Sequence, residues 1–511
     1  AAGERAEFLG CIAARMERGS APSRFTSVPQ HSAKVTALSH KPQLLPWTSA
    51  TSLPWKEICE LFRQHMNPGL FKIIERLGYD STQVVTARDV HYRTRDGQSI
   101  LDCWGGFGTF NVGHNHPRLA AVRRAIDEQE RAELGHAFVP AQAAVLAKNL
   151  ATVMPGDLSV SYLCCTGSEA VEAALKLAQK FHGDRRGRIY FAENAMHGKT
   201  HGALSVTGND RVRLPFKNIS DCVQYRFGDA YALRKLLTSH AADRSAGPAL
   251  AVIVEPIQCG GGVVVPAPGY LRQLRQLCDE FAALLIVDEV QTGFGRTGKL
   301  FAFEHDDIVP DIVTLSKALG GGKAAVAACV SRRKVFQRAY GSTDDCTLHN
   351  ATFNEMTSST ALATEMLHIL YDEGLIDNAA RVGSYLHTRL DDLQTRFSEL
   401  LVDVRGRGLL AGIELRNIAE LLPGATLGQY LPKLRAIGDG PLAVLVASDL
   451  LARHRVLVAF TDFNRNVLRI EPPLTLREEH VDQLIEGLAD VLSQGVTGLI
   501  TRTVERRLLD A

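Results

Sequence analysis

Polar side chains directly follow short apolar runs at three places in the sequence. Short apolar runs without alternation are typical of strands that are buried on both faces of a parallel sheet. Because the carboxyl ends of parallel strands meet at one edge of the sheet, the groups that follow them are expected to lie together there. These groups are Asp288 after Leu284–Val287, Lys317 after Ile312–Leu315, and Gly167 with Ser168 after Val160–Cys164.

Lys317 and Asp288 have chemistry that depends on burial. A lysine in an apolar setting has a lowered pKa and can act as a nucleophile, whereas a surface lysine is solvated. The segments on both sides of Lys317 are apolar, which favours the nucleophile. An unpaired buried carboxylate is costly, so Asp288 is expected to have a cationic partner. The alternative for Asp288 is a helix cap or a salt bridge to Arg296.

The residues from Thr166 to Glu169 open a predicted helix. Thr166 and Glu169 have the spacing of a capping box. The alternative is an anion site, in which Gly167 admits a ligand to the backbone, Ser168 offers a hydroxyl and free amides face the anion. One helix start contributes only about 0.3–2 kcal/mol, so a phosphate held there needs other donors as well.

An anion site, a buried carboxylate and a nucleophilic lysine at one sheet edge suit pyridoxal phosphate. This cofactor needs a lysine that forms an imine, a carboxylate that keeps its ring nitrogen protonated, and a seat for its phosphate. With the ring protonated, the cofactor accepts the electron pair that remains when a substrate loses its Cα proton. The sequence therefore predicts a cofactor site at Lys317, Asp288, Gly167 and Ser168.

The elements that position these residues alternate along the chain. From Pro117 to about Leu375, helical patterns alternate with apolar strands, which predicts an α/β domain with a mostly parallel sheet covered on both faces. The tail mixes strands and helices and predicts a smaller α+β domain. We expect an N-terminal arm or linker (1–54), an N-terminal segment of the small domain (55–117), a large cofactor-binding domain (118–375) and a C-terminal small domain (376–511).

The individual elements follow from hydrophobic periodicity. Predicted strands are Val84–Arg95 and Gln98–Cys103 around the turn Asp96-Gly97, then Val160–Cys164, Ile189–Ala192, Leu250–Val254, Leu284–Val287, Ile312–Leu315, Leu409–Leu415, Val456–Phe460 and Val467–Ile470. Predicted helices are Phe8–Met16, Trp55–His65, Arg118–Glu133, Ala141–Val153, Glu169–Phe181, Tyr270–Phe281, Ala379–Leu393 and Glu478–Leu492.

Composition excludes several classes of partner. The 511-residue chain has 57 Lys+Arg and 56 Asp+Glu, and this balance argues against a nucleic-acid or membrane-surface role. The sequence has no long uninterrupted apolar run that predicts a membrane-spanning helix. Ten cysteines without a CxxC pair argue against a disulfide scaffold or a zinc ribbon. We therefore expect a cytoplasmic protein without a metal site.

Longer motifs surround the predicted cofactor residues. LLIVDEVQTGFGRTGK (284–299) is followed by DIVTLSKALGGG (311–322), and this combination is highly specific. On these motifs the sequence resembles the class III pyridoxal-phosphate-dependent aminotransferases over roughly residues 55–492. Within the class, RQHMNPG (63–69), LDCWGGFGTFNVGH (101–114) and NVLRIEPPLTL (466–476) are most similar to the putrescine aminotransferase group. Further similar stretches are CTGSEAVEAALKLA (165–178), AVIVEPIQ (251–258), HNATF (349–353) and VRGRGLLAGIE (404–414).

The resemblance implies a fold-type I enzyme and a role for each residue around the cofactor ring. Lys317 would form the internal aldimine and then move a proton between the substrate Cα and the cofactor. Asp288 would pair with the pyridine nitrogen, Val290 would pack on the ring face, and Gln291 would bond the phenolic oxygen.

The resemblance also implies the binding of the phosphate and of the substrate. Gly167 and Ser168 would hold the phosphate. Thr352 would reach the phosphate of a neighbouring subunit, so the expected assembly is a homodimer whose sites are shared between subunits. Arg469 would bind a substrate carboxylate, a bidentate task suited to a guanidinium group.

The sequence departs from the family pattern at three places, one of which is Asn354-Glu355-Met356-Thr357, where the family has Gly-Gly-Asn-Pro. Met196 stands where the family has an aromatic residue against the cofactor ring, and we interpret His197 after it as a hydrogen-bonded loop histidine rather than a catalytic one. Cys259-Gly260 stands where the family commonly has Gly-Glu. In relatives that Glu masks the arginine that corresponds to Arg469 for amine substrates. Here Arg469 is either unmasked or paired with another acid.

These observations predict a pyridoxal-phosphate-dependent aminotransferase. Its donor would be a diamine, another ω-amine or a glutamate-like amino acid, and its acceptor a 2-oxo acid or an aldehyde. One alternative is an aldehyde-aminating domain of a larger biosynthetic enzyme, and another is an aminomutase or decarboxylase on the same scaffold. An NAD-dependent oxidoreductase would need a GxGxxG fingerprint after a first strand, which the triplet Gly320–Gly322 does not supply. A non-catalytic binding protein would require that Lys317 is not bonded to cofactor.

Overall fold

The structure is a computed structural model that describes residues 43–135, 137–183, 187–243, 247–422 and 442–509. The predicted helix Phe8–Met16 lies outside the described residues. The chain divides into two compact units, residues 1–61 and residues 62–511. The described part of the first unit holds α2 (Ser49–Ser52) and the start of α3 (Trp55–His65), which confirms the helix predicted there. All site residues discussed below belong to the second unit.

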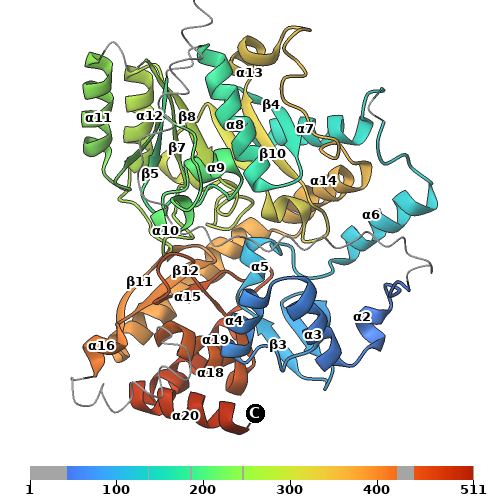
Figure 1. Ribbon diagram of the computed structural model, residues 1–511, viewed down its shortest axis with the longest axis vertical. Helices are drawn as coiled ribbons and strands as arrows, with labels where there is room; N and C mark the ends of the chain where they lie inside the picture. Colours follow the sequence, from blue (N-terminus) through green and yellow to red (C-terminus); the bar gives the residue numbers. More distant parts are fainter. Residues whose placement is uncertain (1–42, 136, 184–186, 244–246, 423–441, 510–511) are drawn as a thin grey trace, which may run out of the picture. The chain divides into compact units, whose positions relative to one another are not determined.

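The second unit contains a seven-stranded sheet in its described part (Figure 1). Strands β5 to β9 pair in parallel, whereas β10 runs antiparallel to both of its neighbours. The expected α/β fold with a mostly parallel sheet is therefore confirmed. In order across the sheet, the strands are β4 (Leu158–Cys164), β10 (Ala327–Arg332), β9 (Ile312–Leu315), β8 (Leu284–Asp288), β7 (Ala249–Val254), β5 (Arg188–Ala192) and β6 (Cys222–Tyr225).

Both faces of this sheet are buried, because successive side chains on each strand enter different hydrophobic cores. On β8, Leu285 and Val287 lie in one core, and Leu284 and Ile286 lie in the other. The continuous apolar runs in the sequence are explained by this two-sided burial. The second core is formed with α8 (Gly167–His182) and α13 (Arg333–Tyr340). The first core is formed with α7 (Ala141–Val153), α11 (Ala230–Ala242), α12 (Tyr270–Glu280) and α14 (Thr357–Asp372).

The second unit also contains two four-stranded sheets in its described part, and one of them combines strands from both ends of the unit. One has the order β1-β2-β3-β13, in which β3 and β13 pair in parallel. The other is antiparallel and has the order β11-β12-β15-β14. The strands are β1 (Val84–Arg88), β2 (His91–Thr94), β3 (Ser99–Asp102), β11 (Leu401–Arg407), β12 (Leu410–Leu415), β13 (Val456–Leu457), β14 (Ala459–Phe460) and β15 (Val467–Ile470).

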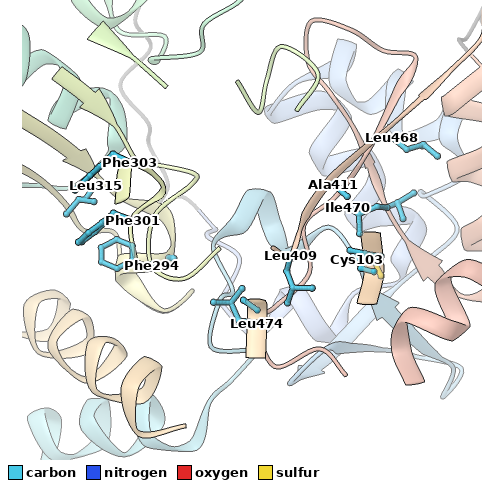
Figure 2. Close-up of a cluster of buried hydrophobic side chains, with 14 of the residues drawn as sticks. Cys103, Phe294, Phe301, Phe303, Leu315, Leu409, Ala411, Leu468, Ile470 and Leu474 are labelled. Carbon is cyan, nitrogen blue, oxygen red and sulfur yellow. The ribbon is translucent and has the colours of Figure 1, made fainter. Parts of the chain in front are cut away.

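The hydrophobic core is continuous between the large sheet and these smaller sheets. Figure 2 shows Phe294, Phe301 and Leu315 beside the large sheet, and Leu409 and Ile470 among the smaller strands. All five side chains belong to one buried cluster. The two parts are therefore packed through a shared apolar interior, which fixes β15 relative to the edge of the large sheet.

The remaining elements are mostly connecting helices. No helix within the described ranges is both long and apolar enough to cross a membrane. The helices are α4 (Pro68–Leu77), α5 (Gly105–Gly108), α6 (Pro117–Glu128), α9 (His201–Ser205), α10 (Asp210–Arg213), α15 (Leu375–Arg396), α16 (Ile418–Leu421), α18 (Leu442–His454), α19 (Glu478–Leu492) and α20 (Gly495–Leu509), with 3-10 turns η1 (Ala302–Asp306) and η2 (Lys317–Gly320).

Candidate active site

The three predicted groups lie at one edge of the seven-stranded sheet. Asp288 ends β8 beside Thr314 of the parallel strand β9, and Lys317 opens η2 directly after that strand. Gly167 opens α8 after β4. A Cβ atom on Gly167 would lie 3.0 Å from Val290 Cγ1 and 3.4 Å from the Cβ of Ser316, so the start of α8 contacts the residues that follow both β8 and β9.

Lys317 has a strained backbone conformation, and its amine is shielded from water. Its φ of 46° is in the left-handed region, which costs a non-glycine residue about 1–3 kcal/mol and persists only where the surroundings enforce it. Its Nζ donates a hydrogen bond to Gln291 Oε1 at 2.5 Å. Burial lowers the pKa of the Lys317 amine, and the charge of Glu471 opposes this shift. The amine is therefore closer to its neutral, nucleophilic form than a surface lysine is.

Asp288 is buried and has a fixed set of partners. Its Oδ1 accepts hydrogen bonds from Thr314 Oγ1 at 2.9 Å and from the Val290 N–H at 3.1 Å. Its Oδ2 lies 2.7 Å from His197 Nδ1. The cationic partner expected from the sequence is thus His197, which carries a charge when protonated. The alternative, a salt bridge between Asp288 and Arg296, is not formed in the structure.

Arg296 instead has a structural role. It is fully buried and donates hydrogen bonds to the carbonyl oxygens of Leu409 and Pro472 and to Asn111 Oδ1. These bonds join the loop after β8 to the segment after β15. The arginine therefore fixes the position of the smaller sheets against the edge that carries Lys317.

The loop Met196–Lys199 lies against the same edge. The Met196 N–H donates a hydrogen bond to Glu255 Oε1 at 2.8 Å, and His197 Nε2 is buried without a hydrogen-bond partner within the described structure. Burial raises the pKa of Glu255 to about 7, although the neighbouring His197 charge opposes the shift. The interpretation of His197 as a hydrogen-bonded loop histidine agrees with this geometry, and its partner is the predicted ring-nitrogen ligand Asp288.

Ser168 connects this loop to the start of α8. Its Oγ accepts a hydrogen bond from the Lys199 N–H at 3.4 Å. A Cβ atom on Gly198 would lie 2.4 Å from the same oxygen, so only glycine admits this close approach, and its φ of 135° also favours glycine. The predicted capping box is confirmed as well: Glu169 Oε2 accepts from the Thr166 N–H at 2.9 Å, and Thr166 Oγ1 accepts from the Glu169 N–H at 3.3 Å.

Arg469 extends from β15 into the site and is 1% exposed. Its Cζ lies 5.1 Å from the centre of the Phe107 ring. Two of its nitrogens, Nε and Nη2, are buried without a hydrogen-bond partner in the described structure. Buried, unbonded donors of this kind are suited to a ligand with a carboxylate.

Glu471 is a site residue that the sequence reasoning missed. It is fully buried, and both of its carboxylate oxygens accept hydrogen bonds from Gln291 Nε2, at 2.9 and 2.8 Å. Its Oε2 also lies 3.3 Å from Arg469 Nε, although that contact lacks hydrogen-bond geometry. The signal in the sequence was the spacing of Arg469 and Glu471, because residues two apart along a strand point to the same side.

Thr352 is not brought to this edge within one chain. It is exposed, as is the neighbouring Phe353, which has 57% of its surface accessible. Within the described residues, the side chain of Thr352 forms no hydrogen bond with Gly167, Ser168 or Lys317.

The edge combines a buried lysine, a carboxylate paired with a histidine, and a glycine at a helix start. This arrangement on an α/β sheet defines the class of pyridoxal-phosphate-dependent transferases. The chain belongs to the class III aminotransferases, because the family model described as Aminotransferase class-III matches residues 77–492.

Three solved structures have the same fold over most of their length. The ornithine aminotransferase from Toxoplasma gondii ME49 is 26% identical with a TM-score of 0.72, covering 87% of this chain and 96% of that one. A thermostable (S)-enantioselective omega-transaminase from Thermomicrobium roseum is 28% identical with a TM-score of 0.74, covering 88% and 99%. An amine transaminase from an uncultivated Pseudomonas species, in its PLP-bound form, is 26% identical with a TM-score of 0.71, covering 81% and 95%.

Family and neighbours together identify the chain as a transaminase, and class III aminotransferases use pyridoxal phosphate. The residues present fit this cofactor. Lys317 supplies an amine with a lowered pKa, and Asp288 supplies a buried carboxylate. The backbone of Gly167 lies close against Val290 and Ser316, so a Cβ atom there would displace these neighbours of the site by a few tenths of an ångström.

Proposed function

We propose that the protein transfers an amino group from an amine or amino acid donor to a 2-oxo acid or aldehyde acceptor, with Lys317 as the residue to which the cofactor is attached. The observation that carries this proposal is the placement of Lys317, Asp288 and Gly167 at one edge of a single sheet. The motif similarity to putrescine aminotransferases supports a donor with a terminal amine. Solved relatives named as ornithine aminotransferase and amine transaminase support the same class of donor.

The proton chemistry falls to Lys317 and Asp288. Pyridoxal phosphate, when bound, supplies an acceptor for the electron pair that is released at the substrate Cα. Lys317 Nζ, whose pKa is lowered by burial, takes the proton from the substrate Cα and later returns a proton. Asp288, oriented by Thr314 and His197, holds the ring nitrogen in its protonated form. Holding the amine beside the bound substrate supplies a high effective molarity.

The other residues orient the cofactor. Gly167 and Ser168 would bind its phosphate at the start of α8, because the backbone N–H groups of a helix start favour an anion. Val290 and Met196 pack against the ring, since a thioether can fill the place of an aromatic residue more loosely. Gln291 bonds the phenolic oxygen of the ring.

Arg469 binds the carboxylate of an amino acid donor or a 2-oxo acid acceptor. Its Nε and Nη2 are buried donors without partners, so a bound carboxylate satisfies both at once. We expect Arg469→Ala to weaken the use of 2-oxoglutarate or glutamate far more than the use of a simple monoamine. Equal losses for both kinds of substrate would refute this role.

The assembly that we propose is a homodimer in which Thr352 completes the phosphate site of the partner subunit. Exposed apolar side chains near Thr352, including Leu348 and Phe353, support a contact surface for a second copy of the chain. Burial of these side chains in a dimer would remove them from water.

The cofactor site is tested by Lys317→Ala. The purified protein is expected to show the visible absorbance band of bound pyridoxal phosphate, and the variant is expected to lose the band and its transaminase activity. Lys235→Ala is the matched control. Because Lys235 lies exposed on α11, this variant should keep both the absorbance band and the activity.

A panel of donors and acceptors then separates diamine, amino acid and aldehyde substrates. The same panel tests for an aminomutase or decarboxylase. A colourless wild-type protein after incubation with the cofactor would contradict the proposal.

A further inference from the structure

Glu471 is a buried acid that the proposed roles leave unexplained. We propose that Glu471 is the counter-charge of Arg469, and that it sets the preference of the site between substrates with a carboxylate and substrates with a second amine. The inference rests on the proposed role of Arg469 as the carboxylate-binding residue. Gly260, in the loop after β7, has no side chain that could serve as this counter-charge.

The contact between the two residues is suited to exchange. Glu471 Oε2 lies 3.3 Å from Arg469 Nε, but the N–H does not point at the oxygen, and both side chains are buried. A ligand carboxylate can therefore take the place of Glu471 without breaking an aligned hydrogen bond. Gln291 Nε2 has two hydrogens, so it can donate one to Glu471 and the other to the cofactor, and Glu471 is not left without a partner when Arg469 binds the ligand.

The negative charge of Glu471 also stabilises the positive charges of Lys317 and Arg296. Burial lowers the pKa of Lys317 and of Arg296, and the charge of Glu471 is the strongest opposing influence on each. The buried thiol of Cys259, whose pKa is raised well above its usual value, faces the same group and adds no charge. Without Glu471, Arg469 would carry an uncompensated positive charge beside Lys317, and this charge would repel the ammonium group of a diamine.

Two glycines of α5, which precedes α6, make room for Glu471 because they have no side chain. A Cβ atom on Gly108 would lie 2.4 Å from Glu471 Oε1, and one on Gly105 would lie 2.3 Å from the Glu471 backbone oxygen. Both glycines have positive φ values. The Trp104–Gly108 turn is thus shaped around Glu471, so the acid has a defined position opposite Arg469 rather than a loosely packed one.

The test is calorimetric binding of glutarate, an unreactive dicarboxylate, to the cofactor-loaded protein. Glu471→Gln keeps an oxygen that can accept from Gln291 but removes the charge. We expect glutarate to bind about tenfold more tightly, equivalent to about 1.4 kcal/mol, and kcat/KM for 1,4-diaminobutane to fall. Structural damage would weaken glutarate binding instead, so a weaker or unchanged Kd overturns the proposal.

Two further variants separate the possible failures. Arg469→Ala should abolish glutarate binding. If it does not, the proposed role of Arg469 is wrong and the inference falls with it. If it does while Glu471→Gln leaves the Kd unchanged, only the inference on Glu471 is wrong.

The matched control is Glu414→Gln on β12, because Glu414 pairs with Arg405 in the same sheet, and it should leave the glutarate Kd unchanged. A tighter Kd in this control would overturn the assignment to Glu471.

If Glu471→Gln does not fold, Glu471→Asp is the second variant. It keeps the negative charge but, being one methylene shorter, places the carboxylate farther from Arg469. A partial gain in glutarate affinity is then expected, and an unchanged Kd overturns the proposal.

Discussion

At the residue scale, the sequence identified the groups that follow strands but not the partners that orient them. Lys317 and Asp288 could be predicted because each lies within two residues of the end of an apolar run. The hydroxyl of Thr314 and the imidazole of His197 could not be assigned to Asp288, because their approach depends on strand register and on a loop. Glu471 was missed for the same reason, since its contacts with Gln291 and Arg469 arise only when β15 packs at the sheet edge.

Glu255 leads to a prediction about pH and stability. Burial raises its pKa to about 7 from 4.5, so the folded state binds more protons than the unfolded state between these values. The free energy of unfolding therefore falls as pH rises through this window. Glu255→Gln keeps an oxygen for the Met196 N–H and removes the buried charge.

We expect the cofactor-free Glu255→Gln variant to gain stability over wild type as pH rises from about 4.5 to 7, by on the order of 3 kcal/mol at most. Denaturant titrations of both proteins at pH 5 and pH 8 measure the difference. Some pH dependence should remain in the variant, because burial also raises the pKa of Glu289 to about 7. Parallel stability curves for the two proteins would contradict the prediction.

At the element scale, most helices and buried strands predicted from periodicity are present in the described structure, whereas α11, α14, α18, α20 and β6 were not predicted. The predicted strand Val84–Arg95 is broken at Asp89, whose φ of 53° interrupts the extended backbone between β1 and β2. Strand β10 was not predicted, because its residues Ala327–Arg332 are small or polar as well as apolar. Its antiparallel place between β4 and β9 depends on pairing over long distances in sequence.

The start of α8 offers a pair of variants that separate cofactor binding from helix stability. Gly167→Ala places a Cβ atom 3.0 Å from Val290 Cγ1, so we expect weaker pyridoxal phosphate binding without a loss of thermal stability in the cofactor-free protein. Thr166→Ala removes the side-chain cap and should cost about 1 kcal/mol of stability while cofactor affinity is retained. Absorbance titrations and thermal melts measure the two effects. The same loss of affinity in both variants would count against a phosphate site at Gly167.

At the scale of the whole molecule, the fold class could be predicted from the alternation of helices and strands, whereas the assembly could not. In a single chain, Thr352 is exposed at the surface, so burial alone assigns it to no site. Sequence periodicity reports which faces of an element are buried within the chain. It does not report which exposed faces contact a second copy.

The proposed dimer is tested at Thr352 and Phe353. Thr352→Ala should leave the dimer intact but lower its affinity for pyridoxal phosphate, because one hydroxyl donor to the phosphate is lost. Phe353→Arg places a charge on the proposed contact surface and should give monomers that retain little cofactor. Light scattering gives the mass, and absorbance gives the bound cofactor. Monomeric wild-type protein, or unchanged cofactor retention in the Thr352→Ala dimer, would contradict the shared site.

The pairing of β3 with β13 has a consequence for the synthesis of the protein. Leu101 and Val456 are neighbours in one sheet, yet a ribosome releases the first long before it makes the second. The edge of β3 that β13 later covers must stay unpaired while the ribosome makes the residues of the large sheet. An unpaired strand edge can form hydrogen bonds with other strands, which leads to misfolding or aggregation. This sheet thus begins with one of the first strands made and closes only after residue 457 has been made, and such long-range pairing makes its completion a slow step that chaperones would favour.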